Sequence, residues 1–212
     1  MKKLLLGLFL AVAVSFSATA QLSYGVRAGV NLAKISVKSE GITINPSNNV
    51  GFNLTAYMDA PIAPGLSIQP GISLQNKGMK FDLGSFIDDD WEVDEDIADK
   101  YTLSLMYLEV PVNLVYYLPA GSGDVFLGAG PYLGIGIGGK EKYGSVSEDV
   151  TWGDDGFKRL DAGANFLLGY KLLNGFTINA GYGLGLMNMD GEGGEYGTAK
   201  NRVLSFGVGF QF

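Results

Sequence analysis

The sequence predicts an all-β fold, an eight-stranded antiparallel up-and-down transmembrane β-barrel. Large apolar residues alternate with small or polar ones in eight segments, whereas no window keeps the 3.6-residue apolar spacing of an amphipathic helix. The last segment, Asn201 to Phe212, alternates strictly and ends on an aromatic residue. Such a strand is expected to pair with the first strand of an outer-membrane barrel, which leaves no free sheet edge. A soluble edge strand is the alternative interpretation of this segment taken alone.

The N-terminal residues have the three parts of an export signal. The pair Lys2-Lys3 is positive, an apolar run follows from Leu4 to Val14, and Ala18-Thr19-Ala20 fits the small-residue cleavage pattern. The apolar run is shorter than the ~20 residues that a membrane-spanning helix needs. We therefore expect residues 1–20 to be a signal peptide and residues 21–212 to form one outer-membrane β-barrel domain.

Composition argues against several kinds of chemistry. The chain has no cysteine and no histidine, which excludes disulfides, thiol nucleophiles and histidine-based acid–base or zinc chemistry. Without Lys2-Lys3, 13 basic residues remain against 22 acidic ones, and this balance argues against nucleic acid as a partner. The 32 glycines, together with 12 Phe, 11 Tyr and 2 Trp residues, favour a barrel built of strands over a helical domain.

Each of the eight segments has one apolar face and one face of small, polar or charged residues, because successive side chains of a strand point to opposite sides. In the first segment, for example, Val26 and Val30 share one parity while Arg27 and Asn31 share the other. The eight segments are Leu22 to Ala33, Val50 to Asp59, Leu66 to Lys77, Thr102 to Leu118, Val125 to Gly138, Arg159 to Lys171, Phe176 to Leu186 and Asn201 to Phe212.

The connections between the segments alternate in length. Short ones contain turn-forming residues; they are Pro61 to Gly65, Pro119 to Gly123 and Asn174-Gly175. Three short turns at one end and four long loops at the other are the layout of a transmembrane barrel with both termini in the periplasm. The long connections are Ile35 to Asn49, Phe81 to Lys100, Gly139 to Gly156 and Met187 to Ala199.

Periodicity alone does not decide which face lies inside, since a lipocalin-like soluble barrel would turn its apolar residues inward. The interior of an eight-stranded barrel is only just wide enough for side chains, which favours the small and polar face there. Aromatic residues of the apolar parity also gather at the short-turn end, as in the aromatic girdle of a membrane barrel. We therefore expect the apolar face to contact lipid. The girdle residues are Tyr24, Tyr116, Tyr170, Phe176, Phe210 and Phe212.

Several stretches carry a family resemblance. They are Gly25-Val-Arg-Ala-Gly-Val-Asn-Leu32, Tyr107-Leu-Glu-Val-Pro-Val-Asn-Leu114, Gly130-Pro-Tyr-Leu-Gly134, Asn201-Arg-Val-Leu-Ser-Phe206 and Phe157-Lys-Arg-Leu-Asp-Ala-Gly163. Together they resemble the PorT-like family of small outer-membrane β-barrel domains in Gram-negative bacteria, over the whole mature chain. The resemblance implies the fold and a location in the cell outer membrane. It implies activity poorly, because proteins with one barrel serve different roles.

The inward parity places six charged residues in the lumen. A charge in so narrow an interior is costly unless it is paired, so we expect a structural plug of salt bridges. A gated or narrow ion path is the alternative, whereas paired carboxylates of the glycosidase type would lack access to a substrate. The sequence therefore predicts no enzyme, no catalytic residues, no cofactor and no metal site. The six residues are Arg27, Asp59, Glu109, Arg159, Asp161 and Lys171.

Two loop motifs have simple interpretations. The acidic run Asp88 to Asp96 lacks the central glycine and the closing glutamate of a calcium loop, so we expect a solvated loop, with weak binding of divalent cations as the alternative. Gly191-Glu-Gly-Gly-Glu195 is not followed by the Lys-Ser/Thr pair or the helix of a phosphate-binding loop.

The sequence thus favours a structural or partner-binding barrel that acts through long extracellular loops. The alternatives are a small passive pore, an enzyme of the loops or rim, and an accessory component of a protein secretion system. The expected partners are outer-membrane lipid, an extracellular or periplasmic protein, and, during assembly, the barrel insertion machinery. Phe212 resembles the terminal aromatic signal that this machinery reads.

Overall fold

The computed structural model describes residues 22–39, 42–44, 46–82, 100–153, 156–189 and 198–212. No helix within these ranges is long and apolar enough to cross a membrane. All elements in them are strands: β1 (Ser23–Ser39), β2 (Ile42–Ile44), β3 (Asn49–Ala63), β4 (Leu66–Asp82), β5 (Lys100–Ala120), β6 (Gly123–Tyr143), β7 (Val146–Asp149), β8 (Leu160–Leu172), β9 (Phe176–Gly185) and β10 (Thr198–Gln211).

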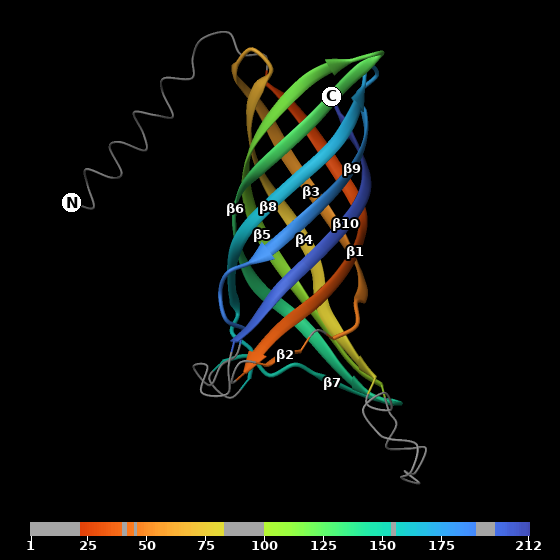
Figure 1. Cartoon of the computed structure of the whole chain (residues 1–212), viewed down its shortest axis with the longest axis vertical. Coiled ribbons are helices and arrows are strands. Elements are labelled where there is room, and N and C mark those ends of the chain that lie inside the picture. Colours follow the sequence, from red (N-terminus) through yellow and green to blue (C-terminus); the bar gives the residue numbers. More distant parts are fainter. Residues whose placement is uncertain (1–21, 40–41, 45, 83–99, 154–155, 190–197) are drawn as a thin grey trace, which may run out of the picture.

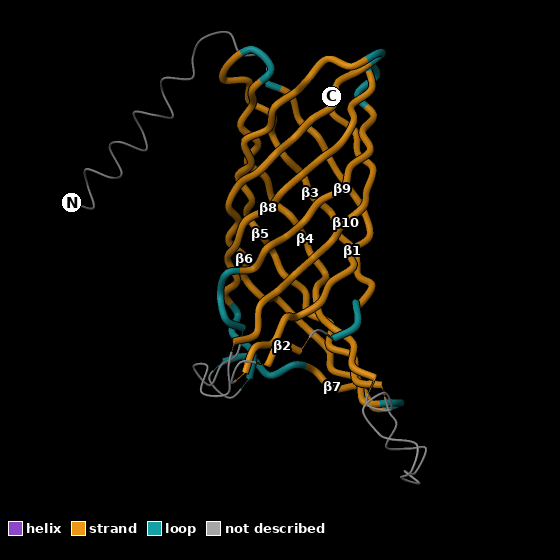
Figure 2. Tube along the Cα trace, in the orientation of Figure 1, coloured by secondary structure: helices purple, strands orange, loops and turns teal. Residues whose placement is uncertain are grey.

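Eight of these strands close into an antiparallel barrel in the order β1-β3-β4-β5-β6-β8-β9-β10 (Figures 1 and 2). The last strand pairs with the first from Gly25 opposite Gln211 to Lys38 opposite Thr198. Tyr24 and Phe212 add two backbone hydrogen bonds, of 3.0 and 2.8 Å. The closure satisfies both strand edges, and the predicted eight-stranded up-and-down barrel is confirmed.

The two ends of the barrel differ. Three tight turns, the start of β1 and Phe212 lie at one end, and the hairpin strands β2 and β7 lie at the other (Figure 1). We call these the turn end and the hairpin end. β5 and β6 each have 21 residues, about twice what a barrel strand needs to cross a bilayer, so both project beyond it at the hairpin end. Residues predicted as long loops, such as Gly139 to Tyr143, therefore continue the strands. The predicted signal peptide, the acidic run and Gly191 to Glu195 lie outside the described residues.

The two faces of the wall follow the predicted parity. On β1, Val26 and Val30 are 45 and 49% exposed, whereas Arg27 and Asn31 are 8 and 0% exposed. The same alternation holds on β10, where the even positions Leu204, Phe206, Val208 and Phe210 point outward. The girdle residue Tyr24 stacks on Phe212 with ring centroids 6.5 Å apart. An apolar band thus surrounds the barrel, and the polar face lines a lumen.

Glycines on the inner face make room for aromatic rings from the neighbouring strand. A Cβ at Gly25 would lie 2.3 Å from the ring of Tyr57, its register partner on β3. Gly163 leaves the same space for Tyr132 of β6, where a Cβ would come within 2.7 Å of the ring. This pairing of the smallest residue with the largest fills a narrow bore, and it explains why the chain is rich in both.

Candidate functional site in the barrel lumen

The hairpin-end half of the lumen contains a direct ion-pair cluster. Lys77 of β4 lies 2.5 Å from Glu109 Oε1 and 2.9 Å from Asp161 Oδ2. The Asp161 Oδ2 atom also accepts hydrogen bonds from Tyr132 Oη at 3.2 Å and Asn201 Nδ2 at 2.9 Å. These groups come from β4, β5, β6, β8 and β10, so the cluster ties together five strands. We call it the Lys77 cluster.

An apolar layer covers the Lys77 cluster toward the hairpin end. Leu103, Leu105 and Tyr107 of β5 are all fully buried within it. The segment after β7 folds inward and places Trp152 edge-on against Tyr107, with ring centroids 6.0 Å apart at 89°. A Cβ at Gly136 would lie 2.3 Å from this indole, so the glycine gives the ring its place. The buried members of this apolar plug are Ile35, Leu103, Leu105, Tyr107, Val150 and Met189.

The turn-end half of the lumen holds a second polar cluster, in which neutral groups separate the charges. Arg27 donates a hydrogen bond to Gln69 Oε1 and lies over the Tyr57 ring, 3.9 Å from its centroid. Gln69 Nε2 in turn donates to Asp59 Oδ1 at 2.7 Å. The amide thus relays between the two charges. Asp59 also accepts from Ser67 Oγ at 3.2 Å, Tyr117 Oη at 3.2 Å and Gln211 Nε2 at 3.4 Å. We call this the Asp59 cluster.

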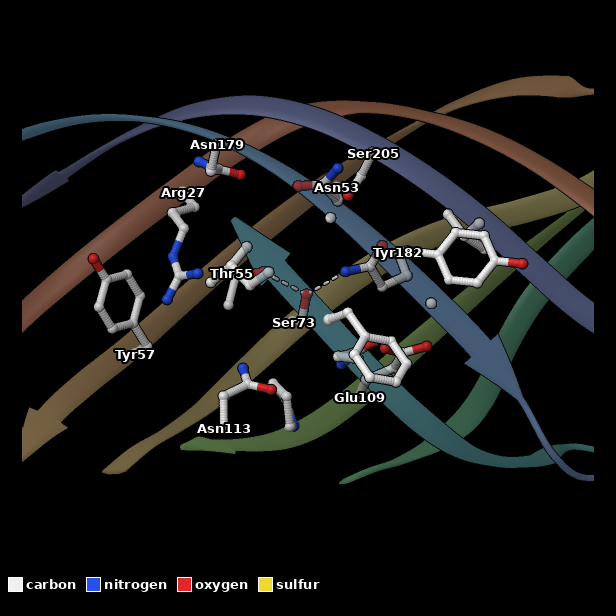
Figure 3. A pocket seen from close by; sticks show the side chains of 18 of the residues that line it. Arg27, Asn53, Thr55, Tyr57, Ser73, Glu109, Asn113, Asn179, Tyr182 and Ser205 are labelled. Carbon is white, nitrogen blue, oxygen red and sulfur yellow. Dashed lines mark hydrogen bonds between the residues drawn. The ribbon is translucent and has the colours of Figure 1, made fainter. Parts of the chain in front are cut away.

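A polar cavity of about 90 Å³ lies between the two clusters (Figure 3). Thr55 and Ser73 share a hydrogen bond of 2.6 Å at its wall, which Figure 3 shows as a dashed line. Asn113 Oδ1 and Asn179 Nδ2 also belong to lining residues, and among the described residues neither atom has a hydrogen-bond partner. Buried polar atoms of this kind are normally satisfied by ordered water, and the cavity has room for several water molecules. The middle of the lumen therefore holds a small cavity between the two clusters.

The structure places the six charged residues predicted for the lumen in three settings. Arg27, Asp59, Glu109 and Asp161 are buried inside the barrel, as predicted. Lys171 lies nearer the turn-end mouth, where it pairs with Asp124 at 3.6 Å and both side chains are partly exposed. The prediction of a buried, paired charge was wrong for Arg159: it precedes β8, is exposed, and lies over the Trp152 ring with its Cζ 5.4 Å from the centroid. Its Nη1 donates to the backbone oxygen of Gly136 at 3.2 Å. Strand parity does not predict how deeply a residue outside the strand is buried.

Sequence reasoning missed two central residues. Lys77 ends a predicted strand on its inward parity, so the alternation alone could have placed it among the lumen charges. Trp152 lies in a segment predicted as a long loop, and no local pattern there indicates that the loop turns into the bore. Gly136 leaves the space that the Trp152 indole occupies, but the sequence alone does not show that a ring lies there.

Comparison with known proteins identifies the family of this barrel. Residues 15–191, most of the chain, match the family model for the outer membrane protein beta-barrel domain. The chain belongs to this family. As an outer-membrane barrel, it contacts lipid through its apolar band and encloses both polar clusters within the membrane. Bacterial barrels keep their short turns in the periplasm and their longer loops outside the cell, so we expect the turn end to be periplasmic and the hairpin end extracellular.

Solved structures of outer-membrane proteins are also similar to this chain. Neisserial surface protein A matches with a TM-score of 0.47 and 14% identity, over 89% of this chain and 97% of that one. Ail of Yersinia pestis matches with a TM-score of 0.44 and 16% identity, over 90 and 98% of the two chains. OprG of Pseudomonas aeruginosa matches with a TM-score of 0.42 and 11% identity, over 91 and 97%. No curated protein sequence matches the chain.

Proposed function

We propose that this chain is a non-conducting, non-enzymatic barrel of the outer membrane that presents its extracellular hairpins to a protein partner. The observation that carries the proposal is how the described side chains fill the bore. The Lys77 cluster joins five strands across it, and the apolar plug lies above that cluster. A solute would have to break buried ion pairs and displace the plug, and breaking one buried pair costs about 3–5 kcal/mol. The projecting strands β5 and β6, with β7, supply an exposed surface for a partner.

The experiment for closure is conductance of the purified mature protein in planar bilayers. We expect no stable single-channel steps. The small-pore alternative is supported by the polar cavity between the clusters, and it predicts reproducible steps whose ion selectivity changes in Glu109→Gln or Arg27→Gln. Such steps would overturn the proposal, and Arg159→Gln serves as the control because its side chain is exposed and belongs to neither charged cluster.

The partner part of the proposal is tested on intact cells. Cross-linking from a cysteine placed at the exposed Ser145 of the β6–β7 hairpin, followed by isolation of the outer membrane, should capture a protein that a cysteine at Ser122 of a periplasmic turn does not capture. The PorT-like resemblance supports a narrower version, in which the partner belongs to a protein secretion system. Capture at the periplasmic turn alone would contradict an extracellular partner.

Assembly is expected to involve the barrel insertion machinery through Phe212. This residue is 69% exposed on the outer face of the closing strand, so its deletion removes only the ring contact and the two backbone hydrogen bonds with Tyr24. We expect the deletion to lower the assembled protein in cells much more than it lowers stability in refolded detergent samples. Matched losses in the two assays would identify Phe212 as an ordinary girdle residue.

A further inference from the structure

Three basic side chains meet on the outer face of the barrel, where β1 and β10 close it at the hairpin end. Lys34 is the register partner of Arg202, and Lys200 pairs with Ser36 two positions further along. The even positions of both strands face outward, so all three side chains share the face of Leu32 and Leu204. Figure 1 shows these strands side by side in this region. We call the three residues the seam patch.

The seam patch lies at the edge of the apolar band. Moving along β10 toward the hairpin end, the outward residues change from Phe206 and Leu204 to Arg202 and Lys200. On β1 the change from Leu32 to Lys34 occurs at the same height, because Leu32 pairs with Leu204. The position just beyond the apolar band of a membrane barrel is the headgroup region. The patch therefore lies where lipid headgroups of the outer leaflet meet the wall.

The charges of the seam patch are not balanced by acidic neighbours within the described residues. The ion pairs found there join Lys77 to Glu109 and Asp161, and Lys171 to Asp124. Lys34 and Arg202 lie directly opposite one another, and like charges in that position destabilise a sheet. Arg202 is also held in place, because its Nη1 donates to the backbone oxygens of Gly185 and Asn201 at 2.8 Å each. Among the described residues, the patch is thus a positive site without an acidic counterpart, and Arg202 holds a defined position in it.

The opposite end of the barrel shows a different surface. There the outward residues of the described strands are aromatic or aliphatic, such as Tyr24, Tyr116 and Phe210, and none is charged. The hairpin end also offers a comparison, since Lys140 faces outward but pairs in register with Asp149 of β7. The basic charge is thus confined to the extracellular edge of the band, and at the seam it lacks an acidic partner in the described part of the chain.

We propose that the seam patch binds phosphate groups of anionic lipids in the outer leaflet. Basic residues beside a membrane attract anionic headgroups, and lysine and arginine donate charge-assisted hydrogen bonds to phosphate. The patch faces sideways into the headgroup layer rather than outward from the hairpins, which favours a lipid over an acidic protein as the occupant. The inference does not depend on whether the barrel conducts or binds a protein partner.

The test uses the mature protein in phosphatidylcholine nanodiscs that contain bisphosphorylated lipid A, with bound lipid A counted by native mass spectrometry. The variant is Lys34→Gln/Lys200→Gln, which leaves Arg202 in place because that residue also holds the end of β9. We expect the affinity for lipid A to fall about fivefold for each lysine removed. Lys140→Gln, which removes one outward charge opposite Asp149, is the matched control and should change the affinity less than twofold, roughly.

A second measurement separates lipid binding from folding. In nanodiscs of phosphatidylcholine alone, Lys34→Gln should unfold at an equal or higher urea concentration, because it removes a like-charge contact. With lipid A present, the same variant should unfold at a lower concentration than the wild type, because it loses the ligand. Equal retention of phosphorylated and dephosphorylated lipid A would overturn the proposal, as would equal losses in Lys140→Gln. Protection by inorganic phosphate alone that equals that of lipid A would replace the lipid with a free anion.

Discussion

The two polar clusters of the lumen handle buried charge in different ways. In the Lys77 cluster the charges touch directly, at 2.5 and 2.9 Å, and the apolar plug lies over them. In the Asp59 cluster the Gln69 amide stands between Arg27 and Asp59. That cluster also reaches Gln211 near the chain end, whose Nε2 donates to Ser23 Oγ at 2.7 Å.

The difference follows from what surrounds each cluster. Beneath the apolar plug, an ion without a counterion would carry nearly its full desolvation cost, so only a direct opposite charge compensates it. Near the turn-end mouth, a hydroxyl can either donate or accept and an amide offers a donor and an acceptor, so the loss of one partner is tolerated better. The Lys77 cluster should therefore be stiff and intolerant of substitution, whereas the Asp59 cluster should be adaptable.

The largest effect should come from Lys77→Met in the Lys77 cluster. This change leaves the Glu109 and Asp161 carboxylates buried without their shared cation, and it should lower the free energy of unfolding by about 3–5 kcal/mol. Urea unfolding in lipid vesicles, followed by gel migration of the folded form, measures the loss. The charge argument is checked by Lys77→Met/Glu109→Gln/Asp161→Asn, which should recover most of the stability. An equally unstable triple variant would show that packing rather than charge is at fault.

Loss of the apolar plug should come next. Leu105→Ala removes a fully buried side chain from it and should cost about 2–5 kcal/mol, because transfer and cavity terms add. Leu118→Ala, on the outward face near the periplasmic turn, is the matched control, since it leaves only a lipid contact to be lost. The two variants are compared by their urea midpoints. Similar midpoints would mean that the hairpin-end interior is not packed as a core.

Much of this fold was predictable because the strand period is exact. Each inward or outward assignment follows from parity, so one anchored residue such as Arg27 fixes its strand as far as the next bulge. A register shift opposite Met106 and Tyr107 reverses the parity of β6, which is why Lys140 faces outward. The closure of β10 on β1 also follows from the alternation between Asn201 and Phe212, since an unpaired edge in a membrane leaves backbone groups unsatisfied. The strand ends were less predictable. β5 and β6 stay hydrogen-bonded to each other beyond the point where the outward apolar pattern stops.

The site was predictable only in part. Parity gave the buried positions of Glu109, Asp161 and Asp59, but it could not say which charges touch. Those contacts depend on register and barrel shear, which bring residue 77 beside residue 161 across 84 positions of sequence. Arg159 and Trp152 lie outside the long strands, where no period applies, and both were misplaced or missed for that reason.

The Asp59 cluster should lose less stability on substitution than the Lys77 cluster. Asp59→Asn removes a carboxylate that accepts from four side chains, and hydrogen bonds to charged groups contribute about 1.5–3 kcal/mol. Ser67 and Tyr117 can rotate their hydroxyls to accept from the new amide, so we expect a loss in the lower part of this range. Urea midpoints of Asp59→Asn and Lys77→Met, measured in the same vesicles, test the comparison directly. A larger loss for Asp59→Asn would reverse the assignment of stiff and adaptable halves.

The smallest effects should come from two tyrosine hydroxyls, one in each half. Tyr117 Oη accepts from Gln69 Nε2 at 2.8 Å and donates toward Asp59 or Gln211. Tyr117→Phe should cost about 0.5–1.5 kcal/mol, since the ring still lies beneath the Lys171 ammonium, 4.3 Å from its centroid.

Tyr107 in the outer half should behave in the opposite way. Its hydroxyl is buried and has no hydrogen-bond partner among the described residues, while its ring packs in the apolar plug against Trp152. Tyr107→Phe keeps the ring and removes an unsatisfied polar atom, so stability should stay the same or rise. Urea unfolding of the two single variants and their double variant decides the matter. A loss in Tyr107→Phe equal to that in Tyr117→Phe would mean that the outer hydroxyl is hydrogen-bonded after all, and that the plug admits a polar partner.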